Sequence, residues 1–443
     1  MAGKPTCGRT PQQEDGGNLL TLTASEDRGA GFDVILGNPP FLNQLESATA
    51  TARGLAGIVR ARSGDAIRSY TDLSATFLLF STHIVRAGGC VALVQPQSLL
   101  AVKDAEPVRR ELLKDGTLES LWVSNEHVFP GVSVFTCAPT IRVGGPRRGP
   151  LHRSTTGAFT PLPPMMLDND QLAHEETWAH LAAAASGIPE VTIQSSGTIA
   201  DLADATADFR DQYYGLDGFL VEHSVLNPDQ QADFVAFPPI ITTGLIDLAQ
   251  CLWGSSTSRI LKTKWQAPRI DRERMIRDGT LGPWIVSRLV PKVLIATQTR
   301  VIEAFADAEG RFIPSVPVLT VTPKDATRLW HIAAALASPV CTALAMQKYA
   351  GAALNTDAIK LSAKQVLQLP LPSPSKHWDA AADQLRIATA ATESNERLVA
   401  LRRMAQASMH AFQIPIAECD TLLKWWWARL TGESVQEDAD EHA

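Results

Sequence analysis

Residues 32–41 read Phe-Asp-Val-Ile-Leu-Gly-Asn-Pro-Pro-Phe, and this stretch decides the fold. Its first five residues are nearly all apolar, which is typical of a strand buried in a parallel sheet. Gly37 permits a close backbone approach, and the two prolines fix φ in the loop that follows. We therefore predict a strand from Phe32 to Leu36 that ends in a rigid loop. The loop residues are Asn38, Pro39, Pro40 and Phe41.

The residues after this loop alternate between helix and strand patterns. An apolar stripe predicts a helix over 72–86 with Asp72 as its cap, and a second helix is expected over 104–113. Strands are expected over 90–94, 118–123 and 134–143. This alternation indicates half of a doubly wound, Rossmann-like α/β sheet, in which ligands bind beyond the carboxyl ends of the strands. The stripe consists of Leu73, Phe77, Phe80 and Ile84.

Composition narrows the class of protein. The chain has 443 residues, 45% hydrophobic and 20% charged, without an apolar run long enough to cross a bilayer. Its polar, Gly-rich start resembles no signal peptide, so we expect a cytoplasmic protein without a membrane partner. A net charge of −7 argues against indiscriminate coating of nucleic acid, so any DNA contact requires a local basic surface. Neither the scattered cysteines nor His174 and His180 have metal-ligand spacing, so no metal is expected.

The Asn-Pro-Pro-Phe loop suits one kind of chemistry. The exocyclic amino group of a base is a poor nucleophile because its lone pair is delocalised into the ring, and acceptors for its two hydrogens would localise that pair. The side-chain oxygen of Asn38 and the carbonyl of Pro39 could be these acceptors, while Phe41 stacks on a base flipped from the duplex. The alternative interpretation is an ordinary strand-to-loop turn. The preceding strand and glycine favour the catalytic interpretation.

These motifs resemble the N-6 adenine-specific DNA methyltransferases that carry a long C-terminal target-recognition region. Besides the loop, the resemblance rests on Tyr70-Thr71-Asp72-Leu73, on Gly88-Gly89 before a strand that ends at Gln95-Pro96, and on Phe129-Pro130-Gly131-Val132-Ser133-Val134. It implies that Phe129 helps to hold the flipped base; the alternative for Phe129 is a core residue. It also implies double-stranded DNA as the substrate and S-adenosyl-L-methionine as the methyl donor.

The resemblance also gives meaning to the divisions of the chain. We expect residues 1–31 to be a remnant of the cofactor-binding half, and residues 32–145 to form the catalytic half of a partial methyltransferase sheet. Residues 146–372 would be a mixed α+β target-recognition domain, and residues 373–443 a helical region with an acidic tail. The two boundaries follow turn-forming and proline-rich stretches, at 144–150 and 369–374.

The cofactor site is incomplete in the sequence. Relatives hold the donor with a Gly-rich loop that follows a strand and opens a helix, and no such loop precedes Phe32. Gly29-Ala30-Gly31 runs directly into a strand and does not qualify. Asn18 stands where the family commonly has an acidic residue near the cofactor adenine, so it is the candidate cofactor contact. We expect a misassigned start codon, a partner chain with the cofactor half, or gene decay.

Three stretches resemble the family's recognition region: 209–216, 243–254 and 292–300. Between them lies the densest basic stretch of the chain, which is either a DNA-binding surface or an ordinary solvated face. The predicted DNA contacts are Lys262, Lys264, Trp265, Arg269 and Arg272.

The sequence therefore predicts a site-specific adenine methyltransferase of bacterial restriction-modification or phage defence. One alternative is a DNA-recognition module without catalysis, or a split-enzyme subunit without its own cofactor site. Methylation of a protein glutamine amide is another, because that chemistry also uses an Asn-Pro-Pro-aromatic loop. The long region after Pro150 argues against it.

Overall fold

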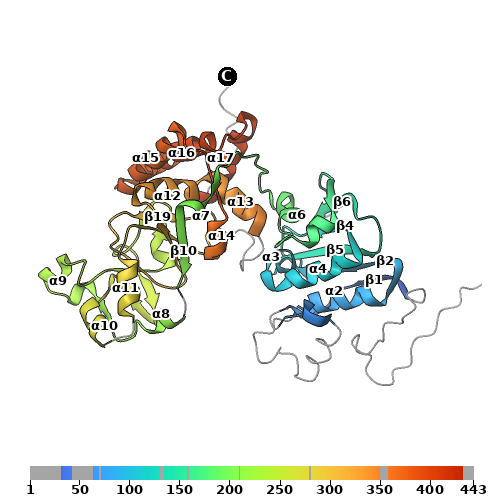
Figure 1. Cartoon of the computed structure of the whole chain (residues 1–443), viewed down its shortest axis with the longest axis horizontal. Coiled ribbons are helices and arrows are strands. Elements are labelled where there is room, and N and C mark those ends of the chain that lie inside the picture. Colours follow the sequence, from blue (N-terminus) through green and yellow to red (C-terminus); the bar gives the residue numbers. More distant parts are fainter. Residues whose placement is uncertain are drawn as a thin grey trace, which may run out of the picture. The chain divides into compact units, whose positions relative to one another are not determined.

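The computed structural model describes residues 31–41, 63–68, 71–129, 134–156, 159–208, 210–278, 281–349 and 358–432. The chain forms two compact units, the first ending at Leu181 and the second beginning at Ala182. Figure 1 colours the chain from blue at its amino terminus to red at its carboxyl terminus. Asn18 lies outside the described residues.

The first unit is built on one mixed sheet with the strand order β1-β2-β5-β4-β6-β7. Strands β1–β2 and β4–β6 pair in parallel, whereas β2–β5 and β4–β5 pair antiparallel. The expected doubly wound, Rossmann-like sheet is therefore a mixed sheet, with both parallel and antiparallel pairs. The strands are β1 (Phe32–Gly37), β2 (Val85–Leu93), β3 (Gln95–Pro96), β4 (Gly116–Val123), β5 (Thr136–Val143), β6 (Arg148–Thr155), β7 (Thr160–Pro161) and β8 (Met165–Asp168).

The predicted boundary after residue 145 does not coincide with the division of the structure. Residues 144–147 form a turn, after which β6 returns to the same sheet beside β4, with Ser120 opposite His152. A parallel neighbour that is distant in sequence leaves no local signal, so a turn inside the sheet resembles a linker between domains.

Helices α2 and α4 confirm two sequence predictions. Helix α2 begins after Asp72, whose carboxylate accepts a hydrogen bond from the Ser74 backbone nitrogen at 2.8 Å. Its buried face differs from the predicted stripe, because Ala75, Leu78 and Leu79 are buried whereas Phe77 is only half-buried. The helices of this part are α2 (Leu73–Ile84), α3 (Ser98–Ala101), α4 (Glu106–Lys114), α5 (Asn169–Ala173) and α6 (His180–Ala183).

The two faces of β1 have different environments. Ile35 packs against the core that contains Val91 and Leu78, beside α2 and α4. Successive residues of a strand point to opposite faces, and the residues on the other face of β1 are exposed. Their exposed fractions are 58% for Phe32, 55% for Val34 and 73% for Leu36. Among the described strands, β1 pairs only with β2.

The second unit contains a four-stranded antiparallel sheet in the order β10-β21-β18-β19. Smaller strand pairs surround it, including the hairpin β15–β16 and the pair β11–β17. The strands are β9 (Gly197–Thr198), β10 (Ala203–Ala207), β11 (Leu220–Glu222), β12 (Ile240–Ile241), β13 (Ile246–Asp247), β14 (Gln250–Cys251), β15 (Ser258–Ile260), β16 (Thr263–Trp265), β17 (Pro268–Ile270), β18 (Lys292–Ile295), β19 (Ala304–Asp307), β20 (Ile313–Pro314), β21 (Leu319–Pro323) and β22 (Pro370–Leu371).

Helices complete the second unit. The predicted carboxyl-terminal helices are confirmed as three long ones, drawn in red in Figure 1. The helices are α7 (Ile199–Leu202), α8 (Arg210–Tyr214), α9 (Pro228–Ala232), α10 (Arg272–Asp278), α11 (Gly282–Arg288), α12 (Leu329–Ala337), α13 (Pro339–Tyr349), α14 (Ala363–Leu367), α15 (Lys376–Ala390), α16 (Ser394–Ala411) and α17 (Ile416–Thr431).

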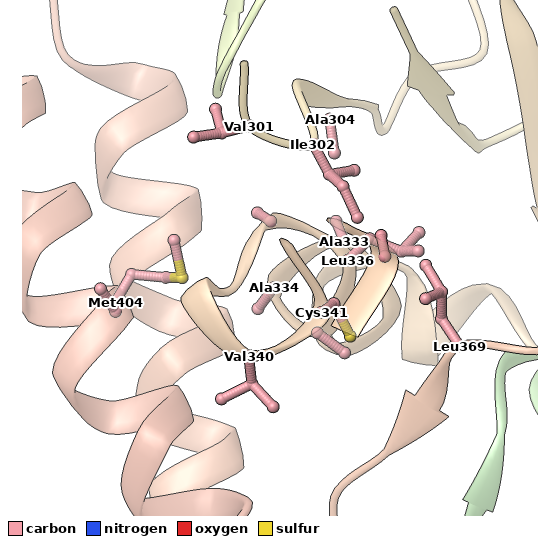
Figure 2. Close-up of a cluster of buried hydrophobic side chains, with 14 of the residues drawn as sticks. Val301, Ile302, Ala304, Ala333, Ala334, Leu336, Val340, Cys341, Leu369 and Met404 are labelled. Atoms are coloured by element: carbon pink, nitrogen blue, oxygen red, sulfur yellow. The ribbon is translucent and has the colours of Figure 1, made fainter. Parts of the chain in front are cut away.

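The core of the second unit joins the four-stranded sheet to these helices. Figure 2 shows part of this core, in which Leu336 of α12, Val340 of α13 and Met404 of α16 belong to one cluster with Ile302. Trp378 of α15 belongs to the same core, so the carboxyl-terminal helices are part of this unit rather than a separate segment. No single described helix is long and apolar enough to span a membrane; α12 and α13 reach that length only as a pair bent by 57°.

Candidate functional site

The Asn38–Phe41 loop lies at the carboxyl end of β1. The carbonyl of Gly37 accepts a hydrogen bond from the Val94 nitrogen at 3.0 Å, which ties the start of the loop to the end of β2. Pro39 is buried, whereas Asn38 and Pro40 are exposed. Because the proline rings restrict the backbone, the loop presents the Asn38 amide to solvent from a fixed base.

Two aromatic rings from distant parts of the sequence meet at this loop. The ring centroids of Phe41 and Phe129 lie 6.2 Å apart, and the ring planes are inclined by 75°. Both side chains are half-buried. This separation is typical of an edge-to-face aromatic pair. The structure thus brings the predicted base-holding residue beside the predicted catalytic loop.

Two buried glutamines support the neighbouring strand end. The sequence interpretation named Gln95 only as the end of a strand and did not name Gln97. The Gln95 amide nitrogen donates to the carbonyls of Ser74, at 3.1 Å, and Val94, at 3.0 Å. The Gln97 amide nitrogen donates to the carbonyls of Ser124 and Thr136. Buried amides of this kind hold backbone segments in place. The signal in the sequence is a polar Gln-Pro-Gln run directly after a buried strand.

The loop and Phe129 offer acceptors and aromatic surface, and none of these five described residues carries an ionisable side chain. Asn38 carries an amide oxygen, and the adjacent Pro39 carbonyl is a second acceptor because proline contributes a carbonyl but no N–H. Asp72 is committed elsewhere: burial raises the pKa of its carboxyl group, while hydrogen bonds from Ser74 lower it, and its role is to cap α2. Such a site can bind an amino group attached to a flat ring.

A methyl-donor pocket is not formed by the described residues. Among them, no Gly-rich loop follows a strand and opens a helix beside β1. Asn18, the candidate cofactor contact, lies outside the described residues. The described part of the site therefore fits the acceptor of a methyl group and not its donor, and no step is derived through the donor.

The basic stretch of the second unit folds into the β15–β16 hairpin. Lys262 lies at its tip and Lys264 on its second strand, and both are exposed, whereas Trp265 is half-buried. The central turn residues Leu261 and Lys262 have φ of 51° and 67°. These positive values are those that a two-residue hairpin turn requires. Arg259, which the sequence interpretation did not include, is exposed opposite Lys264.

Arg269 does not belong to this surface, which corrects its assignment as a DNA contact. Its side chain is 0% exposed, and its guanidinium group donates to the carbonyls of Phe237 at 3.0 Å and Gln231 at 2.8 Å. Its guanidinium carbon lies 4.3 Å from the centroid of the Phe234 ring. Arg269 thus holds the 230–237 loop against β17. The reason is non-local, because the loop that surrounds it is more than thirty residues away in sequence.

Arg272 is intermediate between these cases. It is half-buried, and one guanidinium nitrogen donates to the Val235 carbonyl at 3.4 Å.

Among the residues that the structure describes, no group of three His, Cys, Asp or Glu side chains could hold a metal ion.

One family model matches the part of the chain that contains the loop. The family model of the Eco57I restriction-modification methylase matches residues 10–129, a range that contains both the Asn38–Phe41 loop and Phe129. No curated protein matches the chain.

Solved structures resemble a larger part of the chain. One of them is the Type IIL restriction-modification enzyme MmeI, solved in complex with DNA. The match covers 90% of this chain and 57% of the MmeI chain, with 13% identity and a TM-score of 0.52. The match to the type IIG restriction endonuclease BpuSI covers 93% of this chain and 56% of BpuSI, with 12% identity and a TM-score of 0.38. This chain thus spans little more than half the length of either. The likeness to MmeI shows a shared fold, and the match to the Eco57I restriction-modification methylase family model covers residues 10–129.

Proposed function

We propose that this chain carries the methyl-acceptor site and the target-recognition region of a site-specific, adenine-specific DNA methyltransferase. The observation that carries the proposal is the exposed Asn38 amide on a proline-stiffened loop, beside the Phe41–Phe129 pair. The match of residues 10–129 to the family model of a restriction-modification methylase makes DNA the expected substrate. Such an enzyme acts on its host's DNA and therefore in the cytoplasm.

Each residue of the loop has a defined task in this proposal. The Asn38 side-chain oxygen and the Pro39 carbonyl accept the two hydrogens of the adenine amino group, which localises the nitrogen lone pair. Phe41 and Phe129 contact the flipped base through their rings. Pro39 and Pro40 keep the two acceptors at a fixed separation, so that little conformational entropy is lost when the base binds.

The methyl group comes from S-adenosyl-L-methionine, the donor that this family uses. Its pocket would be completed by residues outside the described ranges or by a second chain. The chain's own contribution is to hold the acceptor nitrogen with its lone pair directed at the donor.

Double-stranded DNA would contact the second unit through the β15–β16 hairpin. Lys262 and Lys264 would meet phosphates, and Trp265 would support the hairpin from its buried side. Arg272 would contribute at the edge of this surface. MmeI, whose fold is shared, was solved in complex with DNA.

The proposal is tested by identifying the methylated product. The chain is expressed with and without its native upstream DNA in a host that lacks adenine methylation, and nucleosides from genomic DNA are analysed by mass spectrometry. We expect N6-methyladenine when the cofactor half is supplied. Methylcytosine, or methylated glutamine in protein with unmodified DNA, would contradict the proposed acceptor.

A second candidate function is favoured by the exposed face of β1. Phe32, Val34 and Leu36 lie uncovered on one face, as expected for a subunit that docks onto a cofactor-binding partner or has lost catalysis. In a recognition module without catalysis, specific DNA binding would occur with no methylation under any complementation.

A further inference from the structure

A cavity of about 610 Å³ lies beside the β15–β16 hairpin in the second unit. Trp253, Trp265 and His223 contribute aromatic surface to its lining, and Lys264 and Glu222 contribute charge. This volume falls within the range of about 300–1,000 Å³ that is typical of small-molecule sites. The cavity therefore has room for a flat heterocycle.

Internal hydrogen bonds fix the two indole rings of the cavity. The Trp253 indole N–H donates to the Pro268 carbonyl at 2.9 Å, and the Trp265 indole N–H donates to the Ile260 carbonyl at 3.3 Å. The His223 ring packs edge-to-face on Trp253, with centroids 5.6 Å apart. Because both indole donors are occupied, the tryptophans offer the cavity aromatic surface rather than hydrogen bonds.

The polar groups of the lining differ in their availability. The Glu222 carboxylate accepts hydrogen bonds from the backbone nitrogens of Gln266, at 2.9 Å, and Ala267, at 2.8 Å, so it holds the loop. His223 Nδ1, in contrast, is a buried atom without a hydrogen-bond partner. Burial and the nearby Arg269 lower the pKa of His223, so its ring is neutral at pH 7. Because Nδ1 is buried, the His223 ring offers the cavity aromatic surface rather than a hydrogen bond.

Lys264 lines the cavity, and Arg259 and Lys262 lie on the same hairpin. Arg259 and Lys264 stand directly opposite each other on the hairpin, an arrangement in which like charges repel. Within the described ranges, no carboxylate lies within 4.0 Å of Arg259, Lys262 or Lys264, whereas Arg288 of the same unit pairs with Asp208 at 2.7 Å. A phosphate would relieve the repulsion. The two like charges of Arg259 and Lys264 also disfavour a cationic ligand, although two tryptophan rings alone would suit a cation.

We propose that this cavity binds a single nucleotide unit of a DNA strand, with the base against Trp253 and Trp265 and the phosphate on Lys264 and Arg259. The inference deepens the proposed function and rests on it for the choice of DNA. It adds a second base-binding site, separate from the Asn38 loop, which holds a base that is unpaired or turned out of the duplex.

The test compares two fluorescently labelled single strands with the same phosphates, one of thymidine nucleotides and one of abasic sites. Base–aromatic stacking predicts that the full chain binds the thymidine strand about tenfold more tightly. Trp265→Phe should keep this preference because it keeps an aromatic ring. Trp265→Leu should lose it. Both variants lack the indole N–H, so they are matched for the lost hydrogen bond to Ile260.

Phe41→Leu separates the two base sites. If the cavity binds the base, Phe41→Leu keeps the preference for the thymidine strand and Trp265→Leu abolishes it. If instead Phe41→Leu abolishes the preference and Trp265→Leu keeps it, the cavity proposal is overturned, whereas the proposed methyl-acceptor site stays intact. Equal affinity of the wild-type chain for the two strands would also overturn it, and this comparison needs no variant that must fold. Lys264→Gln should weaken both complexes alike.

Discussion

Apolar side chains are exposed on one face of β1 in the first unit and buried in the core around α12 in the second unit. Leu36 is 73% exposed, whereas Leu336 is 0% exposed. Both belong to strongly apolar stretches of sequence, and only the second has neighbours on every side among the described residues. The contrast teaches that an apolar pattern identifies a surface that needs a partner, and the fold decides whether the partner lies within the same unit.

Truncation of one leucine in each region should give the largest difference. Leu336→Ala removes methyl groups from a closed core and should cost about 2–5 kcal/mol of unfolding free energy. Leu36→Ala should cost less than about 0.5 kcal/mol, because the side chain is already in water. Urea unfolding of the two variants measures both values. A comparable loss for Leu36→Ala would mean that the β1 face is covered.

Arginine side chains extend the comparison to charged residues. Arg269→Gln removes a guanidinium group from a buried cage of carbonyls and should cost about 1–3 kcal/mol of stability. Arg259→Gln, on the exposed hairpin, should leave stability unchanged and reduce the salt dependence of DNA binding by about one counterion. Thermal unfolding and DNA titrations at several salt concentrations measure the two effects. A normal stability for Arg269→Gln would restore it as a candidate DNA contact.

A buried carboxyl group should make the stability of the second unit depend on pH. Burial, with a smaller contribution from the nearby Asp247, raises the pKa of Glu303 to about 8. The folded state therefore holds a proton that the unfolded state releases above its ordinary carboxyl pKa. Stability should fall as the pH rises from about 5 to 8, by at most about 1.4 kcal/mol per pH unit.

Glu303→Gln isolates this effect. The variant has no proton to lose at this position, so its advantage over the wild type should grow between pH 5 and pH 8 and then level off. Asp33→Asn on β1 is the matched control, because its carboxylate is exposed and its removal should change stability by less than about 0.5 kcal/mol. Parallel pH profiles for Glu303→Gln and the wild type would show that Glu303 is ionised in the folded protein.

Features encoded by neighbouring residues were predictable from the sequence. The strand β1, the capping of α2 by Asp72 and the helical character of the carboxyl-terminal region follow from local patterns, and the structure confirms them. The proximity of Phe41 and Phe129 followed from the resemblance to a family rather than from any spacing. The catalytic role of the loop stays a prediction.

Features that depend on distant residues were not predictable. Arg269 lies in a basic stretch, and its burial depends on a loop near residue 234 that the stretch does not reveal. The parallel pairing of β4 with β6 made a turn resemble a domain boundary. The cavity is lined by three separate segments of the second unit, which bring His223 and Lys264 together with Trp253 and Trp265. None of these contacts can be inferred from the spacing of residues in the sequence.

The central claim is that the Asn38 amide binds the amino group that becomes methylated. Its most direct test is the N6-methyladenine content of genomic DNA from cells that express Asn38→Ala with its native upstream DNA. Asn395→Ala, an exposed asparagine on α16, serves as the control. We expect at least about a hundredfold loss for Asn38→Ala, and no change for the control. Methylation at the wild-type level by Asn38→Ala would contradict the account.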